Sequence, residues 1–224
     1  MMQRARLLGL AYCVAIICLP ANTIAADASC APVLKAVRAG MAQARIHSAV
    51  DSPLDPEAVK MGMKQTLMHS IVIDKTQYSN ALNTDFSNVP LDSPDMRTLA
   101  TDLAAFEVES GCKILGKETI AGRGAQTYAL ITDLGHGEAR IKLWVDAISG
   151  LPIKAIADEP DFDVETLLEK PKGKQGTKVN VTEKSNGKRV VSTHAYVYGD
   201  LVKPPGAKGT INANTLAALL ALLK

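Results

Sequence analysis

The side chains best able to do chemistry are four histidines, His47, His69, His136 and His194. They lie far apart, and none belongs to an HExxH motif or another compact ligand spacing, so the sequence predicts no metal site. No serine stands in a GxSxG motif, and no Ser/His/Asp order stands out. The glycines of residues 122–124 lack the third glycine of a dinucleotide loop. We therefore expect a protein that is not an enzyme and needs no cofactor.

The charge of the chain is nearly balanced, with 25 Lys+Arg against 23 Asp+Glu in 224 residues. Such a balance, without a basic stripe, argues against nucleic acid as a partner. Apolar residues make up 47% and charged residues 21%, so the chain can build a core. Its length fits one domain or at most two small ones.

One segment concentrates lysine, namely Lys170, Lys172, Lys174 and Lys178. A solvated loop is the ordinary interpretation of such a run. The alternative is a contact with anionic lipid headgroups or with a partner, because each lysine near an anionic surface contributes about 1 kcal/mol.

The N-terminus has the pattern of a secretory signal peptide. Arg4 and Arg6 precede an apolar run over residues 7–19, and small residues follow up to Ala26. The apolar run is shorter than the ~20 residues that span a bilayer. We expect cleavage near Ala25 or Ala26 and a single exported domain, residues 27–224, which is not a transmembrane protein once processed.

Cleavage would leave two cysteines, Cys30 and Cys112. In an oxidising compartment two thiols have one intramolecular pairing, so the sequence predicts a Cys30–Cys112 disulfide. Neither belongs to a CxxC motif, which argues against a redox-active dithiol.

The remaining patterns predict short strands bracketed by helices. We expect a helix over residues 31–41, a second beginning at 93–95, and an Ala/Leu-rich helix over 212–223 whose stripe Leu216, Leu219, Leu220 and Leu223 docks on the domain. Asn186 and Gly187 form the strongest short hairpin signal. The expected strands are residues 45–51, 59–64, 66–73, 76–82, 113–120, 125–132, 139–146, 151–157, 177–184 and 188–198. Successive strands with short turns indicate an antiparallel meander.

Three motifs agree in order with a known family. Residues 142–154, KLWVDAISGLPIK, resemble the W-x-D-x-x-[ST]-G-L-P-x-K hairpin of the periplasmic lipoprotein-carrier-like (LolA/LolB-like) superfamily. Residues 115–128 resemble its preceding G-x-E-x-x-x-G…Y hairpin, and residues 197–205 its closing strand and proline exit. The C-terminal helix departs from the family pattern.

This resemblance implies a mainly β fold with flanking helices (α+β). Its sheet would be a strongly curved antiparallel sheet, an incomplete barrel or half-barrel, with helices over the concave face. Family members bind acyl chains or other apolar groups there and do no chemistry. The resemblance transfers no ligand contacts, because the shared residues are mainly turns.

Candidate ligand-binding residues therefore come from the chain itself. Along one strand Ile141, Leu143 and Val145 point to one side. Met61, Met63 and Met68 are flexible and polarisable, which suits an adaptable apolar surface. An ordinary filled core is the alternative for both sets.

Two functions remain open. The first is a non-enzymatic periplasmic protein that binds a lipid, a lipoprotein acyl chain or another apolar ligand in the half-barrel, as a carrier or sensor in transport. The second is a structural or protein-interaction module of the cell envelope without a small ligand. An open cavity of several hundred Å³ would favour the first, and a concave face filled by helices would favour the second.

Overall fold

The computed structural model describes residues 28–53, 67–80, 86–93, 96, 100, 102–108, 111–133, 137–169, 178–206 and 209–224, with only the backbone for 133 and 162–186. Its elements in chain order are α1 (Ala31–Met41), β1 (Arg45–Asp51), β2 (Leu67–Ile73), β3 (Thr76–Asn80), β4 (Ser87–Pro90), the 3-10 helix η1 (Asp102–Phe106), β5 (Lys113–Ile120), β6 (Arg123–Asp133), β7 (Glu138–Asp146), β8 (Pro152–Glu169), β9 (Lys178–Tyr198), the 3-10 helix η2 (Gly199–Leu201) and α4 (Ala213–Leu223).

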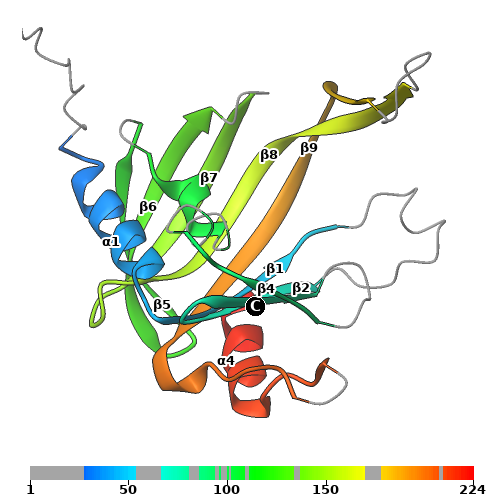
Figure 1. Ribbon diagram of the computed structural model, residues 1–224. Helices are drawn as coiled ribbons and strands as arrows, with labels where there is room; N and C mark the ends of the chain where they lie inside the picture. The colour runs from blue at the N-terminus through cyan, green and yellow to red at the C-terminus, as the bar shows by residue number, and fades with distance from the viewer. Residues whose placement is uncertain are drawn as a thin grey trace, which may run out of the picture.

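The strands form one antiparallel sheet in the order β4-β3-β2-β1-β9-β8-β7-β6-β5. The sheet curves strongly without closing into a barrel (Figure 1). Its two halves are joined where β1 pairs with β9, so that Ala49 lies opposite Ala195. The mainly β fold with a curved antiparallel sheet and flanking helices, predicted from the sequence, is confirmed.

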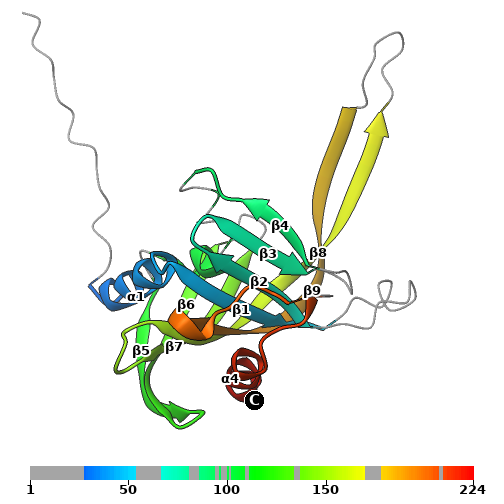
Figure 2. The ribbon, with the colours of Figure 1, turned by 60° about the horizontal axis from the view of Figure 1, so that its bottom comes forward.

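The two largest clusters of buried side chains lie on opposite faces of the sheet. On the concave face α1 and η1 pack over β6 to β9, with Val37 and Phe106 among the enclosed residues. On the other face α4 packs mainly on β9, and its Leu219 joins Trp144 and Val197 in a second cluster. Figure 2 shows α1 and α4 on different sides of the strands. α1 and η1 thus cover the concave face, whereas α4, for which the sequence predicted only that it docks on the domain, lies on the other face.

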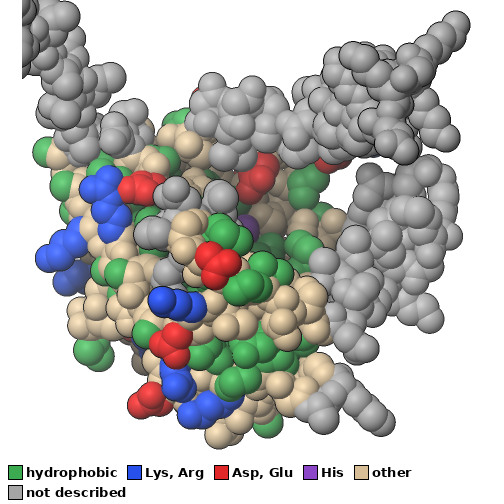
Figure 3. All heavy atoms as spheres, viewed as in Figure 1, with side chains coloured by type: hydrophobic (Ala, Val, Ile, Leu, Met, Phe, Trp, Pro, Cys, Tyr) green, Lys and Arg blue, Asp and Glu red, His purple; other side chains and the backbone are tan. Residues whose placement is uncertain are grey.

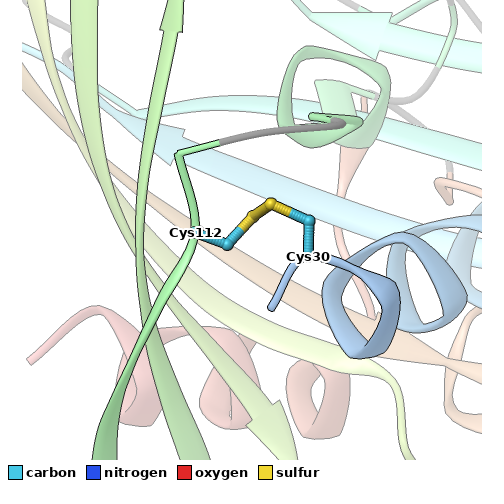
Figure 4. The surroundings of a disulfide bond; sticks show 2 residues. All are labelled: Cys30 and Cys112. Atoms are coloured by element: carbon cyan, nitrogen blue, oxygen red, sulfur yellow. A yellow bond between two sulfur atoms is a disulfide. The ribbon is translucent and has the colours of Figure 1, made fainter. Parts of the chain in front are cut away.

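The disulfide predicted from the sequence is present. Cys30 directly precedes α1, Cys112 directly precedes β5, and the bond joins them across 82 residues (Figure 4). Both cysteines belong to the concave-face cluster. The bond therefore holds α1 against the edge half of the sheet.

The predicted Asn-Gly hairpin is wrong. Residues 178–198 form a single strand, β9, which pairs with β8 from Lys178 to Ala195. Between the pairs Pro160–Arg189 and Phe162–Ser185, β9 carries more residues than β8, and Gly187 has φ +76°. The chain uses the positive φ of this glycine for a bulge and not for a turn, because a long ladder with β8 is available.

The predicted stripe on the C-terminal helix also needs correction. Asn212 caps α4 by accepting hydrogen bonds from the backbone N–H groups of Asn214 and Thr215. The buried residues are Thr215, Leu219 and Leu222, whereas Leu220 is 42% exposed. The Thr215 hydroxyl donates a hydrogen bond to the carbonyl of Leu201. This contact fixes the rotation of the helix about its axis.

Candidate functional site

The concave face is the candidate site, and its residues come from strands on both halves of the sheet. Directly paired residues share a face of a sheet. The registers therefore align one row across it, formed by Met68, Val50, His194, Ala155, Leu143 and Tyr128. A second row beside it consists of Ser192, Ala157, Ile141 and Leu130.

The two ends of this face differ in how far they are covered. Ile141, Leu143 and Val145 are 4%, 0% and 8% exposed and pack in the cluster that contains α1 and η1. At the other end Met68 is 37% exposed. Figure 3, a space-filling view from the same side as Figure 1, shows a hollow with a histidine side chain at its floor. The apolar rows thus run from a filled core to a partly open surface.

The structure brings together only some of the residues that the sequence predicted for a site. Met68, Ile141 and Leu143 share the concave face through the registers. Val145 joins the same cluster. Lys178 begins β9, where only its backbone is described. The other candidates lie outside the described residues, namely Met61, Met63, Lys170, Lys172 and Lys174.

A chain of hydrogen bonds crosses the concave face at the centre of β9. The Ser192 hydroxyl lies 2.9 Å from Nε2 of His194, and Nδ1 of His194 lies 2.7 Å from Oδ2 of Asp102 in η1. The Tyr196 hydroxyl donates to the same Asp102 oxygen at 3.2 Å. The ring of Phe106 meets the His194 ring edge-on, with 5.4 Å between centroids. These contacts fasten η1 to the sheet and add a carboxylate to the polar residues of a mainly apolar face.

The order of these bonds is the one found in Ser-His-Asp hydrolases. A catalytic centre also needs N–H donors aimed at the reacting oxygen, so the bonds alone assign no catalytic role. Sequence reasoning missed this group because Asp102 is 92 residues from His194. A local signal was present: Ser192, His194 and Tyr196 are polar residues at alternating positions of a strand, where one face of the sheet would be expected to be apolar.

Burial raises the pKa of Tyr196 well above its ordinary value, and the nearby charge of Asp102 raises it further. Its hydroxyl therefore keeps its proton and remains a donor to Asp102. Oδ1 of Asp102 is enclosed, and none of the described residues donates a hydrogen bond to it. This acceptor is the unsatisfied end of the polar chain.

The opposite face carries two further polar groups. His47 and His69 meet there, with 3.1 Å between Nε2 and Nδ1. Trp144 donates from Nε1 to Oε2 of Glu118 at 2.8 Å, and the Lys142 ammonium lies 4.5 Å from the centroid of the Trp144 ring. These contacts brace the sheet from outside.

Two cavities lie away from the concave rows. One of about 490 Å³ is bordered by α4, η2, the end of β9 and two turns and is lined mainly by apolar residues, with Arg123 among them. The guanidinium of Arg123 is already paired with Asp146 at 2.7 Å. The other, about 610 Å³, adjoins Ala42, Lys75 and Leu91. Both are large enough for a small ligand.

Within the described part of the chain, no three His, Cys, Asp or Glu residues gather as metal ligands. The helices that the structure describes include none that is long and apolar enough to cross a membrane.

The fold was compared with known proteins. No family model and no curated protein matches the chain. Among solved structures, it is similar to the crystal structure of LprF from Mycobacterium bovis, with 13% identity, a TM-score of 0.44, and coverage of 79% of this chain and 96% of that one. The chain is also similar to the complex structure of Pseudomonas aeruginosa MucA/MucB, with 9% identity and a TM-score of 0.33. That match covers 88% of this chain and 98% of the other. At these scores neither likeness bears on function.

Proposed function

We propose that this chain is an exported, periplasmic, non-enzymatic protein that holds an acyl chain or another apolar ligand against the concave face of its sheet. The observation that carries the proposal is the apolar row that continues beyond the covered core to the exposed Met68. A folded chain that leaves such a surface on its curved face has a place for an apolar group.

The mature chain, residues 27–224, tests this proposal directly. It would be produced by export and weighed by native mass spectrometry before and after organic extraction and refolding. A lipid-sized mass that extraction removes supports the proposal and identifies the ligand class. An unchanged mass, together with no binding of a fluorescent fatty acid at micromolar concentration, contradicts it.

A matched pair of variants tests whether the ligand binds on the concave face. Met68→Glu puts a charge at the open end of the row, and we expect it to weaken fatty-acid binding at least tenfold. Val191→Glu is the control, because Val191 is 53% exposed on the opposite face of the sheet, paired with Asp158. Equal effects of the two substitutions would place the ligand elsewhere.

A protein-interaction module of the envelope is the second candidate, and the β8–β9 ribbon favours it. β7 pairs with β8 only as far as Asp158, and β1 pairs with β9 only as far as Thr193. Beyond these points the two strands continue together and project from the sheet (Figure 2). An extended ribbon of this kind can add a strand from a partner. Removing residues 162–185 would abolish partner capture in crosslinking and leave fatty-acid binding unchanged.

A further inference from the structure

The cavity beside α4 offers a second place for an apolar group, separate from the concave face. Its walls come from the β5–β6 and β7–β8 turns, the end of β9, η2 and α4. Val197 and Leu222 line it, and both belong to the cluster around Trp144 on the other face of the sheet. The proposed function makes no use of this cavity.

The lining of the cavity runs from buried apolar side chains to a rim in contact with solvent. Leu222 and Val197 are 2% and 5% exposed, whereas Leu201 is 51% exposed and the side chain of Arg123 is 44% exposed. The volume of about 490 Å³ is within the range of small-ligand sites. A ligand that enters from solvent can therefore contact apolar side chains and the guanidinium of Arg123 together.

Arg123 alone carries a charge among the lining residues that the structure describes. Its Nε and Nη2 both contact one oxygen of Asp146, Oδ2, at 2.7 Å. A guanidinium has five N–H donors, and these contacts use two of them. Within the described residues the side-chain contacts of Arg123 go to Asp146 alone, so the N–H groups of Nη1 are left for another acceptor.

Asp146 does not depend on Arg123 for most of its hydrogen bonds. Its Oδ1 accepts from the backbone N–H groups of Ile148 and Ser149 and from the Ser149 hydroxyl. Burial by itself would raise the pKa of Asp146, but these donors, and the charge of Arg123 after them, hold that pKa below its ordinary value. The turn thus stabilises the Asp146 carboxylate, and Arg123 can bind a second oxyanion as well.

We propose that the cavity beside α4 binds a single-chain amphiphile with an oxyanion head, a carboxylate or a phosphate monoester, whose head accepts hydrogen bonds from Arg123. The planar fork of an arginine matches the oxygens of both heads. The chain of the ligand would lie against Val197 and Leu222, where burial of apolar surface supplies affinity. This inference goes beyond the proposed function, because the cavity can be occupied while the concave face is empty.

The test is an NMR titration of the ¹⁵N-labelled mature chain with octanoate, octyl phosphate, octylamine and acetate, below micelle concentrations. We expect the two anionic amphiphiles to shift the amide signals of Leu201, Ala218 and Ala221 and to bind there at least tenfold more tightly than octylamine or acetate. Equal affinity of octanoate and octylamine overturns the inference, and so does acetate binding as tightly as octanoate.

The same spectra separate the two faces of the sheet. Val50 and Ala155 report the concave row, and the three residues beside α4 report the cavity. Shifts confined to the concave row overturn this inference and leave the proposed function standing. Shifts confined to the cavity support the inference and count against the proposed function.

Substitutions of arginine assign the charge selectivity. Arg123→Gln should weaken octanoate binding at least fivefold and leave octylamine binding unchanged, whereas Arg123→Lys keeps the charge and should weaken octanoate binding less than threefold. Arg140→Gln is the control, because Arg140 is also paired with a carboxylate, that of Glu138, and does not line the cavity. Equal effects of Arg123→Gln and Arg140→Gln overturn the role of Arg123.

A second pair of variants needs no change at Arg123. Ala221→Phe places a ring in the cavity and should abolish octanoate binding. Ala217→Phe makes the same change at an exposed residue of α4 that does not line the cavity, and binding should persist. Octanoate binding that survives in folded Ala221→Phe means that the cavity is only a packing gap beside α4.

Discussion

His47 and His69 face each other across strands β1 and β2, with Nε2 of one ring 3.1 Å from Nδ1 of the other and both residues buried. An N–H group of one ring donates a hydrogen bond to the nitrogen of the other ring, so the accepting nitrogen must be unprotonated. Burial lowers the pKa of His47 to about 3, helped by the charge of His69, and burial lowers the pKa of His69 to about 4. The pair is therefore neutral in the folded protein near pH 7.

The pair of His47 and His69 predicts that the free energy of unfolding falls in mild acid. In the unfolded chain both histidines bind protons below pH ~6.5, whereas in the folded chain they resist until pH 3 to 4. The free energy of unfolding should fall between about pH 6 and pH 4, by up to about 1.4 kcal/mol per pH unit for each histidine. Urea unfolding at a series of pH values measures this slope. His69→Gln should flatten it, and a slope unchanged in that variant would assign the acid sensitivity to other groups.

The Cys30–Cys112 disulfide closes a loop of 82 residues and ties α1 to the start of β5. By the chain-entropy model a bond across such a loop stabilises the fold by roughly 4 kcal/mol. The double variant Cys30→Ser, Cys112→Ser should therefore unfold at a markedly lower urea concentration. Reductant should destabilise the native protein by a similar amount and leave the double variant unaffected. A native protein insensitive to reductant would contradict this expectation.

The packing of α4 predicts opposite results for two neighbouring leucines. Leu219 is 0% exposed and shares a cluster with Trp144, whereas Leu220 is 42% exposed. Leu219→Ala removes buried methyl groups and should cost about 2–5 kcal/mol of unfolding free energy. Leu220→Ala should cost less than about 1 kcal/mol. Fluorescence of Trp144, the single tryptophan, reports both unfolding curves. Equal costs would mean that the helix docks by another face.

Gly40 in the last turn of α1 allows the helix to approach the rest of the concave-face core. A Cβ atom there would lie 2.9 Å from Cδ1 of Leu103 and 3.2 Å from Cδ of Pro152. Gly40→Ala should change the free energy of unfolding little, because the gain of about 1 kcal/mol in helix propensity is offset by the crowding against these atoms. Gly40→Val has no such gain and should lower the thermal midpoint clearly. Ala39→Val, on the half-exposed neighbour, is the control and should change it little.

The sequence by itself determined the local elements and the cross-link. Alternating residues and short turns predicted β5 to β7, and the two cysteines outside the expected signal peptide predicted the disulfide. Alternation also put Ile141 and Leu143 on one face, because a strand fixes its period of two without reference to its neighbours.

Only the tertiary structure decided which distant segments meet. The Asn186–Gly187 signal gave way to the long β8–β9 ladder, because pairing along the whole preceding strand outweighs a two-residue turn preference. The face of α4 followed from its contacts with β9, since an Ala/Leu-rich helix is apolar on every side. Asp102 reached His194 across 92 residues because η1 packs over the sheet, a contact that no local spacing encodes.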